Sequence, residues 1–202
     1  MRTIQVLPLA VLVMLTGCRD APVPVAEPPA QPQASAGSAA VSPALIATPA
    51  EMAAVKLALD GAGLRLFNTV SGSSRLMAFG LARAELVTAL SGILKIRPQR
   101  EEDVQDCGAH TVSWTNGLTV WFMDDRFAGW SVQPSDKPVL TASGIGLGST
   151  RRELDSAYKI ELVPDSTLGT EFTAGYLSGL LASADPAAKI VHLWAGNTCI
   201  AR

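Results

Sequence analysis

The stretch from Thr111 to Val132, TVSWTNGLTVWFMDDRFAGWSV, predicts a three-stranded antiparallel meander. It is rich in β-branched and aromatic residues, and two turn sequences interrupt it. Asn116-Gly117 is the strongest hairpin sequence in the chain, because both central positions of a type I′ turn need positive φ. Asp124-Asp125 is a second, weaker turn. The expected strands are therefore 111–115, 118–123 and 126–132.

Two-residue turns at both places predict a face of this meander that carries three tryptophans. Cross-strand partners share a face. The predicted tryptophan face contains Trp114, Trp121, Trp130, Val112 and Met123, and the opposite face contains Leu118, Val120, Phe122 and Phe127. Tryptophan is common in cores and in binding hot spots, so this face is either a buried layer or a recognition surface. A slip of one residue in either turn would reverse the assignment.

Two segments that align without a gap predict short amphipathic helices. They are GLARAELVTAL at 80–90 and GSTRRELDSAY at 148–158. Leu86 and Leu90 share one face at helical spacing, as do Leu154 and Tyr158. The second segment also has a capping-box sequence, since Thr150 is followed three residues later by a glutamate.

Strands are expected after each helix, and a further hairpin before the first one. The additional predicted strands are 64–67, 75–78, 160–163, 170–174, 176–182 and 190–195. The fold class expected from this order is α+β: two helix-plus-antiparallel-meander repeats, at about 79–134 and 145–199, forming a two-layer sheet with the helices on one face.

A Gly-x-x-Arg-x-Glu-Leu helix followed by a β-meander, present twice, resembles the fold shared by β-lactamase inhibitory proteins and the small outer-membrane-assembly lipoproteins of the BamE/SmpA type. The resemblance covers about residues 79–199. It implies a domain that binds other proteins and is not an enzyme. The BamE-type lipoproteins carry one unit where this chain carries two, and fold by itself does not imply function.

The N-terminus has the pattern of a lipoprotein signal peptide over residues 1–17. Arg2 precedes an apolar run at 4–15, which is too short to span a bilayer, since that takes about 20 residues. The following Leu15-Thr16-Gly17-Cys18 resembles the bacterial lipobox, in which the cysteine thiol accepts a diacylglyceryl group. The alternative is an ordinary signal peptide with a chance cysteine.

Residues 18–50 are expected to be a lipidated Cys18 and a disordered tether rich in Pro and Ala. Several acyl chains, palmitate among them, hold a protein at a membrane far better than one. Arg19, not an aspartate, follows the cysteine, and resemblance to sorted lipoproteins of two-membraned bacteria then implies the outer membrane, facing the periplasm. The tether is either a spacer or a Pro-rich ligand. The globular domain is predicted at 51–202.

Cys107 and Cys199 are the cysteines that remain once Cys18 is lipidated. Two cysteines in an exported domain usually pair, so we expect a disulfide between them. The alternative is two free thiols.

Composition and motifs offer little to catalysis or nucleic-acid binding. The net charge of −2 gives no basic surface, and the chain's two histidines, His110 and His192, show no metal-site spacing. The glycine-rich segment 144–150 resembles a phosphate-binding loop but has no lysine. Ser156-x-x-Lys159 lacks the companion motifs of penicillin-recognising enzymes. Two charge runs, 101–103 and 124–125, are expected in solvated loops.

We therefore expect a non-catalytic lipoprotein that binds or scaffolds a protein or another envelope partner, without metal, cofactor or nucleic acid. If the tryptophan face is exposed, Trp114, Trp121 and Trp130 form its recognition site. Two alternatives stay open: a cell-envelope hydrolase with an unrecognised site, and a purely structural spacer protein.

Overall fold

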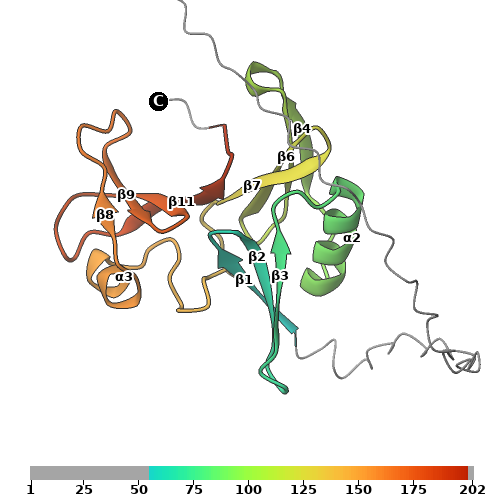
Figure 1. Cartoon of the computed structure of the whole chain (residues 1–202), viewed down its shortest axis with the longest axis horizontal. Helices are drawn as coiled ribbons and strands as arrows, with labels where there is room; N and C mark the ends of the chain where they lie inside the picture. Colours follow the sequence, from blue (N-terminus) through green and yellow to red (C-terminus); the bar gives the residue numbers. More distant parts are fainter. Residues whose placement is uncertain (1–54, 200–202) are drawn as a thin grey trace, which may run out of the picture. The chain divides into compact units, whose positions relative to one another are not determined.

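The computed structural model of the chain describes residues 55–199 (Figure 1). The predicted signal peptide, the lipidation site at Cys18 and the tether lie outside the described residues. No helix within 55–199 is long and apolar enough to cross a membrane.

Eight antiparallel strands form the larger of two sheets. In spatial order they are β4 (Arg100–Val104), β5 (Ala109–Ser113), β6 (Leu118–Met123), β7 (Arg126–Val132), β11 (Ile190–Gly196), β10 (Leu177–Leu181), β9 (Thr170–Ala174) and β8 (Glu161–Leu162). The strands before and after residue 150 meet at one place, where β7 pairs with β11. This pairing joins segments about 60 residues apart into a single surface.

A second, three-stranded sheet precedes them in the chain. It consists of β1 (Val55–Asp60), β2 (Gly63–Asn68) and β3 (Ser74–Ala78), in that order and antiparallel. Leu59 of β1 also makes an isolated parallel bridge to Thr141, and its amide donates to the carbonyl of Leu140. The long connection between β7 and the second helix is thereby tied to the small sheet.

Two α-helices and one short 3-10 helix complete the described elements. They are α2 (Arg83–Leu94), α3 (Arg151–Ala157) and η1 (Gln105–Cys107). The capping box predicted for the second helix is confirmed: the Thr150 hydroxyl accepts a hydrogen bond from the Glu153 amide, and the Glu153 carboxylate accepts one from the Thr150 amide. Each helix buries leucines, Leu86 and Leu90 in α2 and Leu154 in α3.

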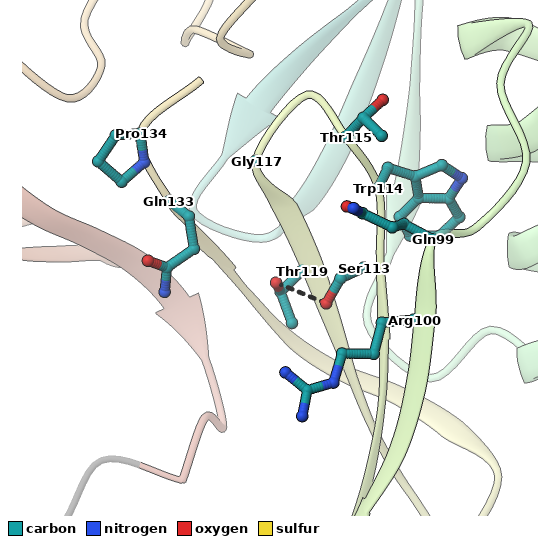
Figure 2. Close-up of a pocket in the computed structure, with 9 residues that line it drawn as sticks. All are labelled: Gln99, Arg100, Ser113, Trp114, Thr115, Gly117, Thr119, Gln133 and Pro134. Carbon is teal, nitrogen blue, oxygen red and sulfur yellow. Dashed lines mark hydrogen bonds between the residues drawn. The ribbon is translucent and has the colours of Figure 1, made fainter.

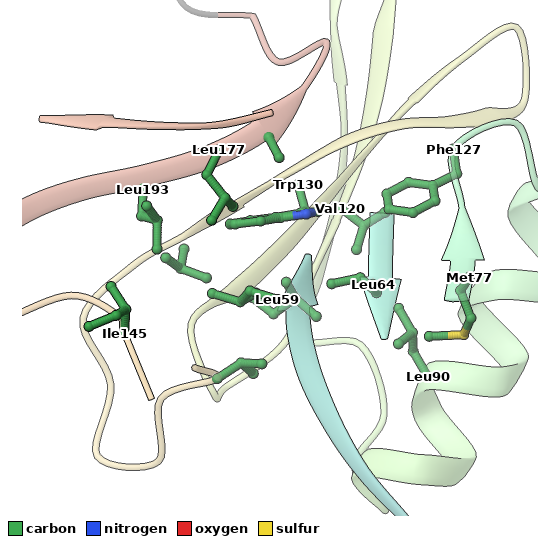
Figure 3. Packing of buried hydrophobic residues seen from close by; sticks show 14 of the residues in the cluster. Leu59, Leu64, Met77, Leu90, Val120, Phe127, Trp130, Ile145, Leu177 and Leu193 are labelled. Carbon is green, nitrogen blue, oxygen red and sulfur yellow. The ribbon is translucent and has the colours of Figure 1, made fainter. Parts of the chain in front are cut away.

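The hydrophobic core lies on one face of the large sheet, and we call this the inner face. The small sheet and both helices contribute side chains to the same core cluster as the large sheet. Figure 3 shows the indole of Trp130 between Leu177 and Val120, close to Leu59 of the small sheet. The Nε1 of Trp130 donates a 2.9 Å hydrogen bond to the carbonyl of Asp60, so a buried polar contact also joins the two sheets.

The predicted fold class, an α+β layer of helices on one sheet, is wrong. The described residues are 15% helical and 43% strand, arranged as two antiparallel sheets with only two short α-helices. The prediction failed because it gave the inner face to the helices. A second sheet instead occupies the middle of that face, with α2 and α3 to either side (Figure 1).

Two strands have sequences that did not predict them. The sequence pattern predicts no strand over Val55–Asp60, where β1 lies, and it predicts a solvated loop for the run Glu101-Glu102-Asp103, which lies in β4. β4 is an edge strand whose first four residues are exposed. Charged side chains are common on edge strands because they hinder pairing with another chain.

Candidate functional site

The face of the large sheet opposite the core, which we call the outer face, is polar along one continuous ladder. One residue of each strand stands beside its neighbour on the next strand. From β4 to β8 the ladder consists of Arg100, Ser113, Thr119, Ser131, Trp194, Ser178, Thr173 and Glu161. Five of these eight side chains carry a hydroxyl group, and a tryptophan lies among them.

The hairpin between β5 and β6 has a register that differs from the predicted one. The Trp114 amide donates to the Leu118 carbonyl at 2.9 Å, and the Gly117 amide donates to the Trp114 carbonyl at 3.1 Å. The loop therefore has three residues, ending with Gly117 at φ +83. Three-residue loops with glycine in the left-handed region are the next commonest hairpin type after two-residue turns. The predicted two-residue turn at Asn116-Gly117 is wrong by one residue.

The hairpin between β6 and β7 has the turn that was expected but contains an irregularity further along. Asp124 and Asp125 have φ of 48 and 60, as a type I′ turn requires. The pairing then shifts, because Phe122 stands opposite Phe127 and Trp121 opposite Gly129, leaving Ala128 as an extra residue. This β-bulge places Trp130 opposite Val120 and not opposite Thr119.

These two shifts separate the three predicted site tryptophans, so the predicted common tryptophan face is wrong. Trp114 and Trp130 point into the core, with exposed fractions of 2% and 0%. Trp121 is half-buried on the outer face. A second tryptophan on that face is Trp194, which stands opposite Ser131. The register of the local hairpins does not reveal it, because only the long-range pairing of β11 with β7 brings it there.

Trp121 and Trp194 both line a hollow on the outer face, which we call the tryptophan groove. Its volume is about 320 Å³. The lining residues are Trp121, Ser131, Val132, Gln133, Leu168, Leu180, His192, Leu193, Trp194 and Thr198. This volume is at the lower end of the range of about 300–1,000 Å³ that is usual for small-molecule sites.

The indole of Trp121 is held in place by the sheet below it. Its Nε1 donates a 2.9 Å hydrogen bond to the Ser131 hydroxyl on the neighbouring strand. Trp194 is 6% exposed, whereas Gln133 and His192 are exposed. The groove thus combines two indoles with planar polar groups that solvent can reach.

The wall formed by Leu168 belongs to the loop between β8 and β9. The Leu168 amide donates to the Ser166 hydroxyl at 3.2 Å, and that hydroxyl donates to the Glu171 carboxylate at 2.6 Å. Glu171 is 2% exposed. A buried carboxylate that accepts hydrogen bonds orders the loop above it, so this wall is structured.

Another part of the lining, Thr198, belongs to the segment that ends at Cys199. Cys107 and Cys199 lie at disulfide distance, with their Cα atoms 6.3 Å apart, so the predicted pairing is present. The Asn197 side chain also donates to the Met123 sulfur at 3.0 Å. These contacts tie the segment carrying Thr198 across the outer face.

A second hollow adjoins the tryptophan groove and shares Gln133 with it; we call it the polar hollow. Its volume is about 480 Å³, and Figure 2 shows its lining residues. The hydroxyls of Ser113 and Thr119 are hydrogen-bonded at 3.0 Å, with the amide of Gln133 on one side of them and the guanidinium of Arg100 nearby. Arg100 also pairs with Glu102 of its own strand.

Three other residues named from the sequence, His110, Ser156 and Lys159, line neither hollow. His110 lies in β5 between Asp103, at 2.7 Å, and Glu101, at 3.5 Å. No group of three or more His, Cys, Asp or Glu in the described part of the chain could hold a metal ion. The Ser156 hydroxyl donates to the Arg152 carbonyl one helical turn earlier.

No protein-family model, curated protein or solved structure matches the chain. The resemblance to BamE-type lipoproteins and β-lactamase inhibitory proteins therefore stays a prediction from short motifs.

Proposed function

We propose that this chain is an exported, lipid-anchored binding protein that holds its partner in the tryptophan groove and catalyses no reaction. The observation that carries the proposal is the groove itself. Two tryptophans, Trp121 and Trp194, lie on the face of the sheet that the core does not use, beside the exposed His192 and Gln133.

A partly exposed indole contributes favourable free energy when a ligand covers it. Covering the exposed part of the Trp121 indole removes apolar surface from water, and tryptophan is enriched in binding hot spots. Its hydrogen bond to Ser131 already fixes the plane of the ring. A preorganised side chain loses little conformational entropy when a ligand covers it, and this favours affinity.

Export and anchoring are supported by the N-terminal sequence and by the cysteine pair. Arg2, the apolar run and the lipobox-like Leu15-Thr16-Gly17-Cys18 are the pattern of a lipidated precursor. A disulfide between Cys107 and Cys199 suits an oxidising compartment such as the periplasm. The partner would then be a protein or another component of the envelope, reached from the outer membrane through the Pro/Ala-rich tether.

The test is a binding titration of the full chain, purified in detergent, with a protein fraction and a glycan fraction of the envelope. The readout is tryptophan emission. Leu180→Glu places a charge in the groove, and Val70→Glu places the same charge on a side chain that is 84% exposed at the β2–β3 turn. We expect saturable binding that Leu180→Glu abolishes and Val70→Glu leaves intact. Equal behaviour of the two variants, or binding of neither fraction, contradicts the proposal.

A further inference from the structure

We infer that the ligand of the tryptophan groove is a neutral saccharide of more than one ring, which also reaches into the polar hollow. The inference rests on the proposed function, because it names the chemical class that the same groove would take.

The tryptophan groove offers no ionic partner to a ligand. None of the described residues that line it is Asp, Glu, Lys or Arg. A phosphate, a carboxylate or an ammonium group buried there would lack an ionic partner, and burying an unpaired charge is costly. Among the lining side chains only His192 can become charged, and it is exposed to solvent. The lining therefore favours an uncharged ligand in the groove, and Arg100, the one charged residue among the described residues that line the polar hollow, is already paired with Glu102.

The half-buried indole of Trp121 lies in the groove together with side chains that carry hydroxyl and amide groups. A pyranose ring has a face of C–H bonds, slightly positive, and an edge of hydroxyl groups. The C–H face packs against the negative face of an indole ring. Hydroxyls both donate and accept, as do the amide of Gln133 and the hydroxyls of Ser131 and Thr198. The Ser131 hydroxyl already accepts a hydrogen bond from Trp121, but a purely aliphatic ligand would cover the Gln133 amide and the Thr198 hydroxyl without offering them one.

The arrangement of the two hollows favours a ligand long enough to occupy both. Gln133 lines both hollows, and the ladder residues Ser113, Thr119 and Ser131 lead from the polar hollow to the tryptophan groove. The two hollows thus lie next to each other along one row of hydroxyl-bearing side chains. A ligand with repeated polar units at regular spacing can use both, which a single ring cannot.

The experiment is a titration of the full chain with two soluble probes, a tetramer of N-acetylglucosamine and a tetramer of glucose, followed by tryptophan emission and by calorimetry. The titration extends to about 10 mM, where a ligand with a Kd of about 1 mM is nearly saturating. Three variants accompany it. Trp121→Ala removes the stacking surface, Gln133→Ala removes an exposed amide shared by the two hollows, and Tyr176→Ala removes an aromatic ring that is 82% exposed outside both.

We expect at least one probe to bind, with affinity about ten-fold or more weaker in Trp121→Ala and measurably weaker in Gln133→Ala. Tyr176→Ala should bind like the unmodified chain. Because Gln133 is exposed, Gln133→Ala should fold even if Trp121→Ala does not. The saccharide affinity of Gln133→Ala then still tests the inference.

Three outcomes overturn the inference. Saccharide binding that neither Trp121→Ala nor Gln133→Ala weakens places the site elsewhere. If neither saccharide binds but the envelope protein fraction binds in a groove-dependent way, the proposed function stands and the saccharide inference is rejected. Absence of both kinds of binding removes the proposed function as well.

Discussion

The indole Nε1 of Trp130 donates a hydrogen bond to the backbone carbonyl of Asp60, which lies 70 positions earlier in the chain. The donor belongs to the eight-stranded sheet and the acceptor to the three-stranded one. Trp114, with an equally buried ring, offers a contrast: its Nε1 is buried without a hydrogen-bond partner among the described residues.

This contrast predicts different costs for one substitution at two sites. Trp130→Phe loses a hydrogen bond between the sheets, whereas Trp114→Phe removes an N–H group that has no partner. We expect Trp130→Phe to lower the free energy of unfolding by about 1 kcal/mol more than Trp114→Phe does. Urea unfolding of both variants measures the difference. Equal losses would mean that packing volume alone sets the cost.

The disulfide pair predicts both a stability effect and a binding effect. Cys107 and Cys199 are 92 positions apart, and closing a loop of that length stabilises the folded state by about 4 kcal/mol. Replacing both with serine should lower the free energy of unfolding by that order and weaken groove binding, because Thr198 loses its anchor. Urea unfolding with and without reductant checks this. The double variant, which has no bridge to reduce, serves as the control and should not respond to reductant.

Gly117 is predicted to tolerate no side chain. Its φ is +83, and a Cβ there would lie 2.1 Å from the Gln133 carbonyl oxygen. Gly72 has a similar φ of +70 but open space around it. Gly72→Ala should therefore cost only the strain of the left-handed region, about 1–2 kcal/mol. Gly117→Ala should cost clearly more, as thermal unfolding would reveal. Similar losses would contradict the close approach of Gly117 to the Gln133 carbonyl.

Asp60 predicts a pH-dependent contribution to stability. Burial tends to raise the pKa of this carboxyl, but hydrogen bonds from the Ala62 amide and the Arg65 guanidinium outweigh it, so the pKa lies below its ordinary value of 3.8. The ionised form is thus favoured by folding. Its contribution is present above about pH 4 and is lost as the pH falls through the lowered pKa.

Asp60→Asn tests this titration. The stability difference between the unmodified chain and the variant should be largest near neutral pH and shrink as urea unfolding is repeated at progressively lower pH. Asp136, an exposed aspartate, gives the matched control Asp136→Asn. If the Asp60→Asn difference stays constant down to about pH 2, the hydrogen bonds do not depend on the charge of Asp60.

Cys18→Ser tests the anchor. The thiol is the group that accepts the lipid, so the serine variant should not be lipidated and should leave the membrane fraction. Fractionation of cells that produce each form, followed by immunodetection, measures the change. Cys107→Ser is the control, because it removes a cysteine of the folded domain and should not affect membrane retention. A soluble native chain would refute lipidation at Cys18.

The sequence by itself determined the features that depend on neighbouring residues. The capping box of α3 needs only Thr150 and Glu153, three positions apart, and the type I′ turn needs only Asp124 and Asp125. The bounds of β6 and β7 agree with the expected strands for the same reason. Each strand is rich in β-branched and aromatic residues and begins or ends at a turn sequence. The pairing of Cys107 with Cys199 could also be predicted, because they are the two cysteines that remain once Cys18 is lipidated.

Only the tertiary structure decided which side chains meet on the outer face. One extra loop residue before Leu118 and one bulged residue, Ala128, moved Trp114 and Trp130 into the core, because a shift of one position turns a strand's side chains over. Trp194 lines the same groove as Trp121 because β11 pairs with β7, and no local pattern encodes that pairing. The fold class was decided in the same way. Burial of the inner face by β1–β3 is a long-range packing event, and the free energy of that burial depends on surfaces that come together only in the folded chain.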